Sequence, residues 1–481
     1  MRAAGLDVGG SSVKAWVADD HGLIGRGRAE YRTLVPAAHR AEFDPDELWS
    51  AARAALLAAF AEAGADAVDA ITLTSLRQGF VLLGDGGELG AGVLNSDRRG
   101  ASQLDAIRDR VGVDALYRIT GHWPAPELTL PKLLHLADRE PERWKATRHV
   151  LFVHDWLAWR LCGELACETS FASAGQLADV TARTWAEDLL DELGLGRARF
   201  PTLVESGTTL GQVTAMAADA VPGLRAGTPV IAGAGDTQVA AFGLGGLSAG
   251  TATVIAGSST PVQAATNTPV QDPRRRPWVS THLRPDLWAA ETNAGYPGAM
   301  YDWVSHVLAR PAAEDGTTLP GRPGAGGVTA VVATPHWTED AWAVKAPRAL
   351  VGLTTATSAD DLARAVLEAH AYAVRSSVED LHDCLPGGVD TVVLGGGAAQ
   401  PALAQLVADV LGRPVLVSRD PVPAAAAGVS LVRRALDGVD RPPRPELAEV
   451  APRESNLYQA PYQRFLDAHG ALHRHLPDHH G

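Results

Sequence analysis

The feature that most constrains the fold of this chain is a succession of predicted elements that occurs twice. Hydrophobic periodicity in the first half predicts three strands joined by short polar turns, then an alanine-rich amphipathic helix and another strand. These elements are expected at residues 3–7, 13–18, 23–31, 46–63 and 70–74. The second half predicts strands, a long helix and a further strand in a similar order, at residues 251–256, 278–282, 288–292, 358–384 and 391–394. Two such units predict two related α/β domains that face a cleft, although no residue-level repeat is visible.

The length of the chain and its glycine content predict how these units are divided. A chain of 481 residues accommodates two or three domains, and a glycine-rich connection at residues 244–250 predicts a hinge. We expect an N-terminal domain over residues 1–243 and a C-terminal domain over residues 244–440. Residues 441–481 are predicted to form a tail with a short helix at about 458–473.

Composition restricts the environment and the partners of the protein. The formal net charge is −14 at pH 7, so the surface potential should repel nucleic acids. The three cysteines, Cys162, Cys167 and Cys384, form no C-x-x-C pair and no zinc-ligand pattern, which predicts reduced thiols. No run of about 18 apolar residues occurs, so no membrane span is expected. We therefore expect a cytoplasmic protein without nucleic-acid or membrane partners.

A turn of small residues after the first strand indicates a site for phosphate groups. Glycines let backbone amides approach phosphate oxygens, hydroxyls add donors, and a carboxylate at the strand end can hold a magnesium ion or its water ligands. An ordinary hairpin turn is the alternative. Neither a dinucleotide-binding loop nor a P-loop is present, because no helix follows directly. The residues of this turn and its flanks are Asp7, Gly9, Gly10, Ser11, Ser12 and Lys14.

An aspartate among glycines follows a buried strand that is predicted at residues 229–232. The segment runs from Gly233 to Gln238 and carries Asp236, close to the predicted hinge. A carboxylate at a strand end beside a cleft is suited to act as a general base. Capping of a following helix is the alternative role for Asp236, and the two roles are compatible.

Two further glycine-rich turns lie in the second half of the chain. Gly257, Ser258 and Ser259 follow a predicted strand and correspond in position to the small-residue turn of the first half. Residues 395–397 are three successive glycines between a predicted strand and a helix at 402–411. Because glycine has no side chain, such a loop leaves room for a flat base to lie on the backbone. A flexible strand-to-helix loop is the alternative.

Taken together in their order and spacing, these four sites resemble the FGGY family of carbohydrate kinases, within the superfamily of actin, hexokinase and the seventy-kilodalton chaperones. The resemblance covers nearly the whole chain. It implies an α/β fold in which two ribonuclease H-like domains, of the actin-like ATPase type, flank a catalytic cleft. Further segments that are similar to the family are residues 75–79, 95–99, 131–134, 154–157, 160–164 and 406–412.

The resemblance implies a phosphotransferase that uses ATP and Mg²⁺ to phosphorylate a hydroxyl of a small sugar, ketose or polyol. Asp236 matches the family's general base, and Asp7 matches the acid that organises magnesium, with Asp236 as a second metal-binding carboxylate, partly through water. Positioning and charge neutralisation do most of the work in phosphoryl transfer, so a small polar set is chemically sufficient. The positions that match ATP-binding residues are Asp7, Gly9, Gly10, Ser11, Ser12, Lys14, Gly257, Ser258, Ser259, Gly396, Gly397 and Gln400.

Further polar residues match positions that line the family's sugar pocket. They are Arg77, Gln78, Asn95 and Asp97, together with Asp236. Their mixture of donors and acceptors suits several hydroxyl groups. A surface charge or a local salt bridge is the alternative for Arg77 and Asp97. Glu291 can also contact substrate, but we expect it to be an exposed carboxylate on a strand.

The substrate is open between two branches of the family. Residues 76–79 read Leu-Arg-Gln-Gly where xylulose kinases carry Gln-Met-His-Gly, and Asn95 stands where glycerol and xylulose kinases have tryptophan. The segments around the predicted base and sugar pocket are instead similar to the autoinducer-2 kinases, whose substrate is a linear five-carbon dihydroxy-ketone. The turn at 257–259 and the segment at 131–134 are similar to the sugar kinases.

Other classes of protein are alternatives to a kinase. A non-catalytic actin-like ATPase would keep both phosphate turns, but it would need neither Asp236 nor the polar residues between 77 and 97. The presence of both Asp7 and Asp236 argues against a nucleotide-binding sensor that has lost activity. A dehydrogenase is the least expected class, because the first strand lacks the dinucleotide fingerprint. The oligomeric state is open, with a homodimer as one expectation.

Overall fold

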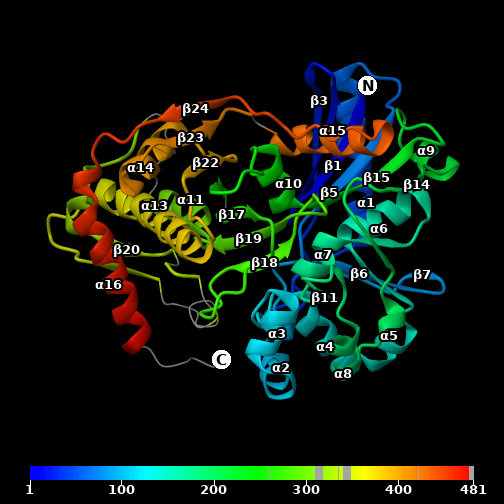
Figure 1. Ribbon diagram of the computed structural model, residues 1–481, viewed down its shortest axis with the longest axis horizontal. Coiled ribbons are helices and arrows are strands. Elements are labelled where there is room, and N and C mark those ends of the chain that lie inside the picture. Colours follow the sequence, from blue (N-terminus) through cyan, green and yellow to red (C-terminus); the bar gives the residue numbers. More distant parts are fainter. Residues whose placement is uncertain are drawn as a thin grey trace.

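The framework of the protein is a pair of mixed β-sheets, one in each half of the chain (Figure 1). The computed structural model describes residues 1–257, 259–308, 318–333, 335–337, 339, 348–420 and 422–475. Helices cover both sheets, and the N-terminal half carries an additional insertion that lies below its sheet in the view of Figure 1. The two sheets and the insertion each have a cluster of buried apolar side chains. The predicted α/β architecture is therefore confirmed.

The N-terminal sheet contains, in spatial order, β14 (Thr209–Gln212), β15 (Pro229–Gly235), β5 (Ala70–Ser75), β1 (Ala3–Val8), β2 (Ser12–Asp19) and β3 (Gly22–Glu30). β1 pairs antiparallel with β2 and parallel with β5, and β5 pairs parallel with β15. Every residue of β5 is buried, as expected for a central strand that is covered on both faces. The carboxyl ends of β1, β5 and β15 therefore meet at one edge of the sheet.

Helix α1 (Pro45–Ala63) covers the antiparallel part of this sheet. The Asp44 side chain caps its first turn, and Gly64 ends it in the left-handed conformation. The buried stripe of the helix packs on β2 and β3. Glycine in β3 allows this close packing, because a Cβ atom at Gly27 would lie 1.9 Å from the carbonyl oxygen of Ala55.

The C-terminal sheet repeats the topology of the N-terminal sheet. Its spatial order is β18 (Trp278–Thr281), β19 (Trp288–Asn293), β17 (Pro261–Thr266), β16 (Thr251–Ile255), β22 (Thr391–Gly395), β23 (Val415–Ser418) and β24 (Leu447–Val450). β16 pairs antiparallel with β17 and parallel with β22, as β1 does with β2 and β5. β23 and β24 take the places of β15 and β14. The repeat that the order of elements predicts is therefore present in the strand pairing.

Sequence patterns missed two strands of this sheet. β17 pairs along its length with β19, but its sequence contains two small alanines and a buried glutamine instead of an alternating pattern. β24 lies in the predicted tail and is an edge strand with no buried position. Neither strand carries the β-branched or aromatic run that marks a strand in sequence.

The helices of the C-terminal half are α11 (Pro297–Val307), α13 (Ala359–Cys384), α14 (Pro401–Leu411) and α16 (Gln459–His475), with a ribbon of β20 (Thr329–Val331) and β21 (Ala349–Val351). The predicted capping pattern at the start of α13 is confirmed, because Ser358 and Asp361 exchange side-chain and backbone hydrogen bonds. The predicted tail helix is α16. It packs on α13 through Tyr462 and Phe465, which contact Tyr372.

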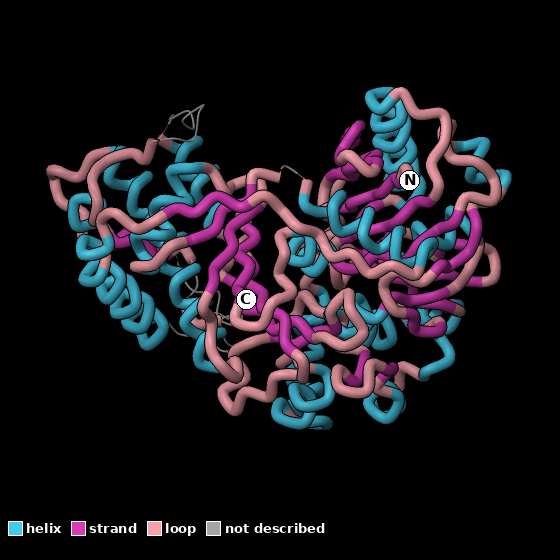
Figure 2. The backbone as a smooth tube through the Cα atoms, turned by 45° about the horizontal axis from the view of Figure 1, so that its top comes forward, coloured by secondary structure: helices cyan, strands magenta, loops and turns pink. Residues whose placement is uncertain are grey.

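Two helices cross between the sheets. α10 (Asp236–Gly243) and α15 (Pro423–Asp437) pack against each other, and α15 lies over the N-terminal sheet although it follows β23 (Figure 1). Figure 2 shows the backbone turned by 45°, with helices around the strands of both halves. Gly428 leaves room for the ring of Trp16, since a Cβ atom at Gly428 would lie 2.3 Å from that ring. A domain boundary drawn at one point of the sequence would group α15 with the C-terminal sheet, although α15 covers the N-terminal sheet. The division into residues 1–243, 244–440 and 441–481 stays a prediction.

The insertion lies mainly between β5 and β15. Its main sheet has the order β4-β8-β6-β7, with β9 also paired to β6. Trp123 of the insertion packs on Trp278 of β18, so the insertion also contacts the C-terminal half. The elements of the insertion are β4 (Glu42–Phe43), β6 (Phe80–Gly84), β7 (Gly87–Glu88), β8 (Gly92–Val93), α2 (Leu104–Val111), α3 (Val113–Thr120), α4 (Thr129–Arg139), α5 (Pro141–Ala146), β9 (His149–Phe152), β10 (Ala166–Glu168), α7 (Thr169–Ala174), β11 (Ala178–Asp179), β12 (Thr184–Trp185), α8 (Glu187–Glu192) and β13 (Thr202–Val204). α6 (Val153–Cys162) and α9 (Ala215–Ala220) follow in the same part of the chain but contribute to the core of the N-terminal sheet.

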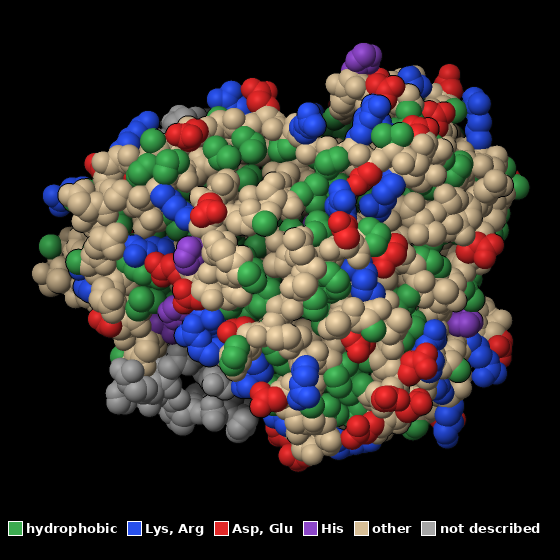
Figure 3. All heavy atoms as spheres, viewed as in Figure 1, with side chains coloured by type: hydrophobic (Ala, Val, Ile, Leu, Met, Phe, Trp, Pro, Cys, Tyr) green, Lys and Arg blue, Asp and Glu red, His purple; other side chains and the backbone are tan. Residues whose placement is uncertain are grey.

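The surface carries both signs of charge. Acidic and basic side chains are intermingled on the face shown in Figure 3. In the part of the chain that the structure describes, no helix is long and apolar enough to cross a membrane. The cysteines are free thiols, of which Cys162 and Cys167 are buried.

Candidate active site

Asp7 and Asp236 lie at the same edge of the N-terminal sheet. Asp7 is near the end of β1, Asp236 follows β15 directly, and β5 lies between these strands. In the register of the sheet, Asp7 is opposite Thr74 and Gly235 is opposite Ser75. The crevice outside the carboxyl ends of parallel strands is the usual place for a ligand in such sheets. The structure thus brings together the two carboxylates that the sequence singled out.

Asp7 is a half-buried carboxylate with few interaction partners in the protein. Burial raises the pKa of Asp7 to about 6; Lys14, its register neighbour on β2, lowers that pKa, and the charge of Asp236 raises it. The carboxylate accepts no hydrogen bond from the residues that the structure describes. Its oxygen lone pairs are therefore available to a cation.

Asp236 is the first residue of α10. Its Oδ1 atom accepts a hydrogen bond from the backbone N–H of Thr237 at 2.7 Å and another from the Thr237 hydroxyl at 3.3 Å. The N-cap residue of α10 is Gly235 and not Asp236. Asp236 therefore contributes to the start of the helix only by accepting the hydrogen bonds from Thr237. Desolvation by the surrounding protein raises the pKa of Asp236, while Arg77 and Thr237 lower it. Among described groups, Oδ2 has no hydrogen-bond donor and stays available.

Side chains of the insertion hold the turn between β15 and α10. The imidazole Nε2 of His154 accepts from the N–H of Gly233 at 3.2 Å, and the hydroxyl of Ser170 accepts from the N–H of Gly235 at 3.0 Å. A Cβ atom at Gly233 would lie 1.6 Å from the carbonyl oxygen of Leu73, so only glycine fits there. The glycines of this motif therefore serve close packing of β15 on β5 and fix the backbone before Asp236.

Arg77 connects the two halves of the chain next to Asp236. Its Nη1 and Nη2 atoms donate to the two carboxylate oxygens of Glu291 on β19, at 2.8 and 2.9 Å. Its Nε atom lies 3.7 Å from Oδ1 of Asp236. Gln263 donates to the same Glu291 carboxylate at 2.6 Å. The expectation of an exposed Glu291 is wrong, because its side chain is 4% exposed and Arg77 compensates its charge.

The turn that carries Gln78 and the segment that carries Asn95 are fixed by Lys132 on α4. Its fully buried ammonium donates to the carbonyl oxygens of Gln78, Leu94 and Asn95, at 3.3, 2.9 and 3.2 Å. Gln78 has a φ angle of +63°, a backbone strain that these contacts help to hold. Two predicted pocket segments that are far from α4 in sequence are thus held by one side chain.

Asp97 has a different role from the one predicted for the sugar pocket. Its carboxylate is fully buried, and Arg99 donates to both oxygens at 2.8 Å from Nε and Nη2. The N–H groups of Arg99 and Ala41 donate to the remaining positions, at 3.0 and 2.7 Å. Because a carboxylate has about four acceptor sites, none remains for a sugar hydroxyl. The alternative of a local salt bridge is the correct one, and Asp97 shapes the segment that carries Asn95.

The first predicted phosphate turn, Gly9 to Ser12, is open to solvent on its outer side. Its backbone closes through a hydrogen bond from Gly9 N–H to Ser12 O at 2.9 Å, and Tyr31 donates to the Gly9 carbonyl at 2.5 Å. A Cβ atom at Gly10 would lie 3.9 Å from Oδ1 of Asn95, so this turn adjoins the predicted sugar pocket. The turn is thus a hairpin held from behind, with Gly10 and Ser11 exposed.

The glycine turns of the C-terminal half lie side by side. A Cβ atom at Gly396, where φ is +100°, would lie 2.4 Å from the carbonyl oxygen of Ala256, just before Gly257. Gly397 has open space around its α-carbon, and the exposed Gln400 donates to its carbonyl oxygen at 3.3 Å. Ser259 is half-buried in the adjoining turn, whereas Ser258 lies outside the described residues.

Sequence reasoning missed the roles of three contributors to this site. Lys132 was visible only as part of a similar segment, and the role of Glu291 depends on a contact with Arg77 across 214 residues. Gln238 is fully buried directly after the base motif, and both atoms of its amide lack a partner among the described residues. Its position two residues after Asp236 was the available signal, since a polar side chain on that turn faces either the core or the cleft.

The comparison with known families rests on both halves of the chain. The sequence model of the N-terminal domain of the FGGY carbohydrate kinases matches residues 3–243, and that of the C-terminal domain matches residues 252–433. The chain belongs to the FGGY family of carbohydrate kinases. The family and the actin-like ATPase fold that the motifs imply are thus confirmed.

The FGGY relatives differ in how much of this chain they match. The autoinducer-2 kinase of Escherichia coli is 33% identical over 308 residues, which are 62% of this chain and 57% of that kinase. The match thus spans little more than half the length of that relative. YoaC of Bacillus subtilis, named as a sugar kinase, is 28% identical over 89% of this chain and 88% of its own length. The crystal structure of xylulose kinase from Rhodospirillum rubrum superposes with a TM-score of 0.85 at 26% identity, over 98% of this chain and 99% of that one.

Proposed function

We propose that this FGGY protein transfers the γ-phosphoryl group of ATP to a hydroxyl group of a small sugar, ketose or polyol, with Asp236 as general base. The observation that carries the proposal is Asp236 itself: an accessible carboxylate with a raised pKa, at the strand edge that also carries Asp7. A base is most effective when its pKa lies closer to the working pH, which favours this environment over an ordinary aspartate.

In this proposal the two halves of the chain divide the binding of ATP. The backbone amides and hydroxyls of the Gly9–Ser12 turn and of the turn from Gly257 to Ser259 bind the phosphates. Lys14 adds a positive charge beside Asp7. The exposed loop with Gly396, Gly397 and Gln400 receives the adenosine, which is supported by the open space beside Gly397. A sparse set of this kind suffices because phosphoryl transfer depends mainly on positioning and charge neutralisation.

The carboxylates of Asp7 and Asp236 fit a magnesium ion. Asp7 is free of hydrogen-bond donors from described residues, and its pKa is raised mainly by burial and also by the charge of the neighbouring Asp236. A bound cation would reduce the repulsion between these two carboxylates. Magnesium in nucleotide sites is commonly held by one or two carboxylates together with phosphate oxygens and water. When bound, Mg²⁺ would neutralise charge on the phosphates.

The proton of the attacking hydroxyl passes to Oδ2 of Asp236, since Oδ1 is occupied by Thr237. Desolvation raises the pKa of Asp236, and the Arg77 guanidinium, 3.7 Å from Oδ1, offsets part of that rise and so favours the charged carboxylate before the proton arrives. Gln78 and Asn95 are the pocket residues that would orient the acceptor. Arg77 contributes through Asp236 and Glu291 rather than as a free sugar ligand.

An autoinducer-2 kinase is the second candidate for the acceptor. Arg77, which pairs with Glu291, favours it, because residues 76–79 read Leu-Arg-Gln-Gly where the xylulose kinases carry Gln-Met-His-Gly. A single screen separates the candidates: ADP release with C3 to C6 ketoses, polyols and the linear dihydroxy-pentanedione. Stimulation by one class alone assigns the branch. If no acceptor raises ADP release above the basal rate, the non-catalytic actin-like ATPase becomes the better description.

Two properties remain predictions of the proposed kinase. A cytoplasmic location follows from composition, and a homodimer is the oligomeric state that we propose to test by light scattering. Neither affects the chemistry proposed for Asp236.

Lys132→Met should weaken acceptor binding more than ATP binding. The substitution leaves buried carbonyl oxygens of Gln78, Leu94 and Asn95 without a donor, so KM for the acceptor should rise about tenfold. KM for ATP should change by less than about twofold because both phosphate turns lie outside these contacts. Lys145→Met, at a side chain that is 71% exposed, is the matched control. Equal changes in the two KM values would contradict the role of Lys132.

The same lysine predicts a pH dependence of stability. Burial lowers the pKa of Lys132 from 10.5 to about 7 in the folded protein. Between these pH values the unfolded chain binds a proton that the folded chain has released, so the free energy of unfolding rises with pH. The stability of the wild type relative to Lys132→Met should therefore increase from about pH 7 to about pH 10, as measured by urea denaturation. A difference that is flat with pH would show that the ammonium stays charged.

A further inference from the structure

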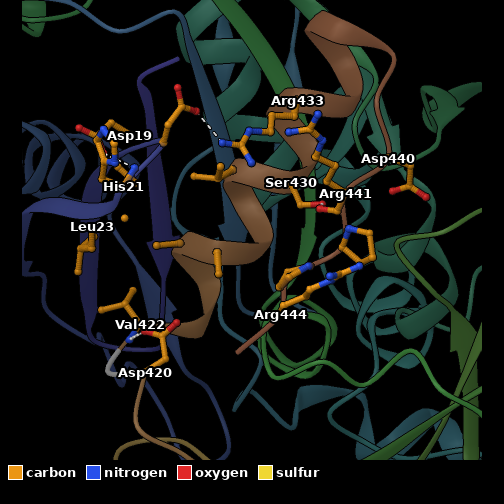
Figure 4. A pocket seen from close by; sticks show the side chains of 18 residues that line it. Asp19, His21, Leu23, Asp420, Val422, Ser430, Arg433, Asp440, Arg441 and Arg444 are labelled. Carbon is orange, nitrogen blue, oxygen red and sulfur yellow. Dashed lines mark hydrogen bonds and ion pairs between the residues drawn. The ribbon is translucent and has the colours of Figure 1, made fainter. Parts of the chain in front are cut away.

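A cavity of about 710 Å³ lies between the two halves of the chain, away from Asp236. Figure 4 shows its walls: the β2–β3 turn with Asp19, His21 and Leu23 on one side, and α15 with the segment that follows it on the other. The volume falls within the range of about 300–1,000 Å³ that is usual for sites of small ligands. A cavity of this size with walls from two domains is a candidate binding site.

The cavity is separate from the proposed catalytic site. The β1–β2 register places Ala18 opposite Ala3, at the start of β1, whereas Asp7 and the phosphate turn lie at its other end. β2 runs from Ser12 to Asp19, which at about 3.3 Å per residue is roughly 23 Å. A ligand in the cavity would therefore not contact the acceptor or the phosphates of ATP.

The carboxylates of the cavity are already bound by the protein. Asp20 accepts from the N-terminal ammonium at 2.8 Å and from Arg433 at 2.6 Å, the dashed contact in Figure 4. Asp440 accepts from Arg284 at 2.7 Å. The other two carboxylates each accept from a backbone N–H two residues further along, at His21 and Val422. Asp20 and Asp440 are thus paired with cationic groups, whereas Asp19 and Asp420 accept only from backbone N–H groups.

Two arginines of the lining are uncompensated. Arg441 and Arg444 are exposed, and their guanidinium groups make no hydrogen bond or ion pair with the residues that the structure describes. Pro442 and Pro443 separate them and restrict the backbone between them. The two cations are therefore carried on a stiff segment at the rim of one cavity.

The floor of the cavity is apolar. Leu23 of β3 and Val422, Ala425, Ala426 and Val429 at α15 contribute it. An apolar floor beneath a few cationic groups suits a ligand with an organic body and an anionic head. Arginine forks bind phosphate through paired hydrogen bonds, and two of them can share the oxygens of one phosphate dianion.

We propose that this cavity is a second ligand site, which binds a small organic monophosphate with its phosphate on Arg441 and Arg444 and its body against α15. The site joins both halves of the chain. α15 covers the N-terminal sheet, and the segment with the two arginines leads on to β24 of the C-terminal sheet. A bound ligand therefore contacts the β2–β3 turn of one sheet and the connection to the other.

Hydrogen–deuterium exchange of the full chain with phenyl phosphate as probe tests this site. Residues 18–24 and 422–446 should become protected, and binding should be about tenfold weaker in the double variant Arg441→Ala/Arg444→Ala. Arg225→Ala is the matched control, because it removes an exposed arginine outside the cavity and should leave binding unchanged. Phenol and inorganic phosphate, which each lack one half of the ligand, should protect these residues less.

Three outcomes would overturn the proposal. The first is no protection of residues 18–24 and 422–446 in the wild type. The second is equal protection in the double variant and in Arg225→Ala. The third is protection confined to the turns at residues 9–12 and 395–397, which would place the probe in the proposed ATP site instead. Because exchange is read without ATP or acceptor, the result does not depend on the proposed kinase activity.

Discussion

Asp236→Asn is expected to lower kcat for the acceptor by a factor of about 10²–10⁴ while ADP and ATP still bind. Asparagine keeps the shape of the side chain and can contact Thr237, but it cannot take the proton of the attacking hydroxyl. The groups proposed to hold the nucleotide lie in the turns at residues 9–12, 257–259 and 396–400, which the substitution does not touch. Turnover by ADP release and nucleotide affinity by calorimetry measure the two parts of this expectation.

The control for this experiment is Asp138→Asn. It removes a carboxylate that is 54% exposed on α4 and pairs with Arg139, so kcat should stay within about twofold of the wild type. If Asp236→Asn kept kcat within tenfold of the wild type, Asp236 would not be the base. If ATP affinity fell together with kcat, Asp236 would act mainly in metal and nucleotide binding.

The strands that precede the glycine-rich turns were predictable because their signals are local. β1, β5 and β15 are short apolar runs, each followed by small or polar residues, and such a run marks a buried strand without knowledge of its partner. The same pattern located Asp7 and Asp236. That these carboxylates share one edge follows from parallel pairing, which the repeated order of elements already indicated.

The contacts that complete the site were not predictable, because they depend on pairing between distant segments. Glu291 lies in an ordinary strand pattern, and only the register of β19 with β17 and the approach of Arg77 show that it is buried. Asp97 failed as a sugar ligand for the same reason: Arg99 is close in sequence, but the donor at Ala41 is 56 residues away. A charged residue in sequence does not reveal whether its partner is solvent, substrate or protein.

α15 illustrates a further limit of sequence patterns. Its alanine-rich stripe predicts a helix that buries one face, but the stripe does not specify which sheet it covers. The close approach of Gly428 to Trp16 places it on the N-terminal sheet, across the boundary that the order of elements implied. Domain boundaries drawn along the sequence therefore describe the order of strands better than the packing of connecting helices.

Arg77→Met should destabilise the protein by about 3–5 kcal/mol, because it leaves the buried carboxylate of Glu291 without its counter-charge. The two side chains are 11% and 4% exposed, and water can replace little of the lost interaction. The double variant Arg77→Met/Glu291→Met should recover much of the loss, since it removes the orphaned charge as well. Urea denaturation of the wild type, both single variants and the double variant gives the coupling energy of the pair.

The exposed pair Arg28 and Glu30 provides the matched control, because its side chains are 60% and 76% exposed. Arg28→Met should change the stability by no more than about 0.5 kcal/mol. If Arg77→Met cost no more than this control, the pair with Glu291 would be solvated in solution and would not join the two halves of the chain.

Arg77→Met also makes a prediction about catalysis that a purely structural role would not produce. Arg77 lowers the pKa of Asp236 and Glu291 raises it, so the two residues act on the base with opposite sign. Because a base works only in its deprotonated form, loss of Arg77 should move the acid limb of the kcat/KM profile to higher pH. Glu291→Gln should move it to lower pH. If the acid limbs of the two variants shifted in the same direction, or not at all, Arg77 would not influence the pKa of Asp236. Its role would then be only to join the two sheets.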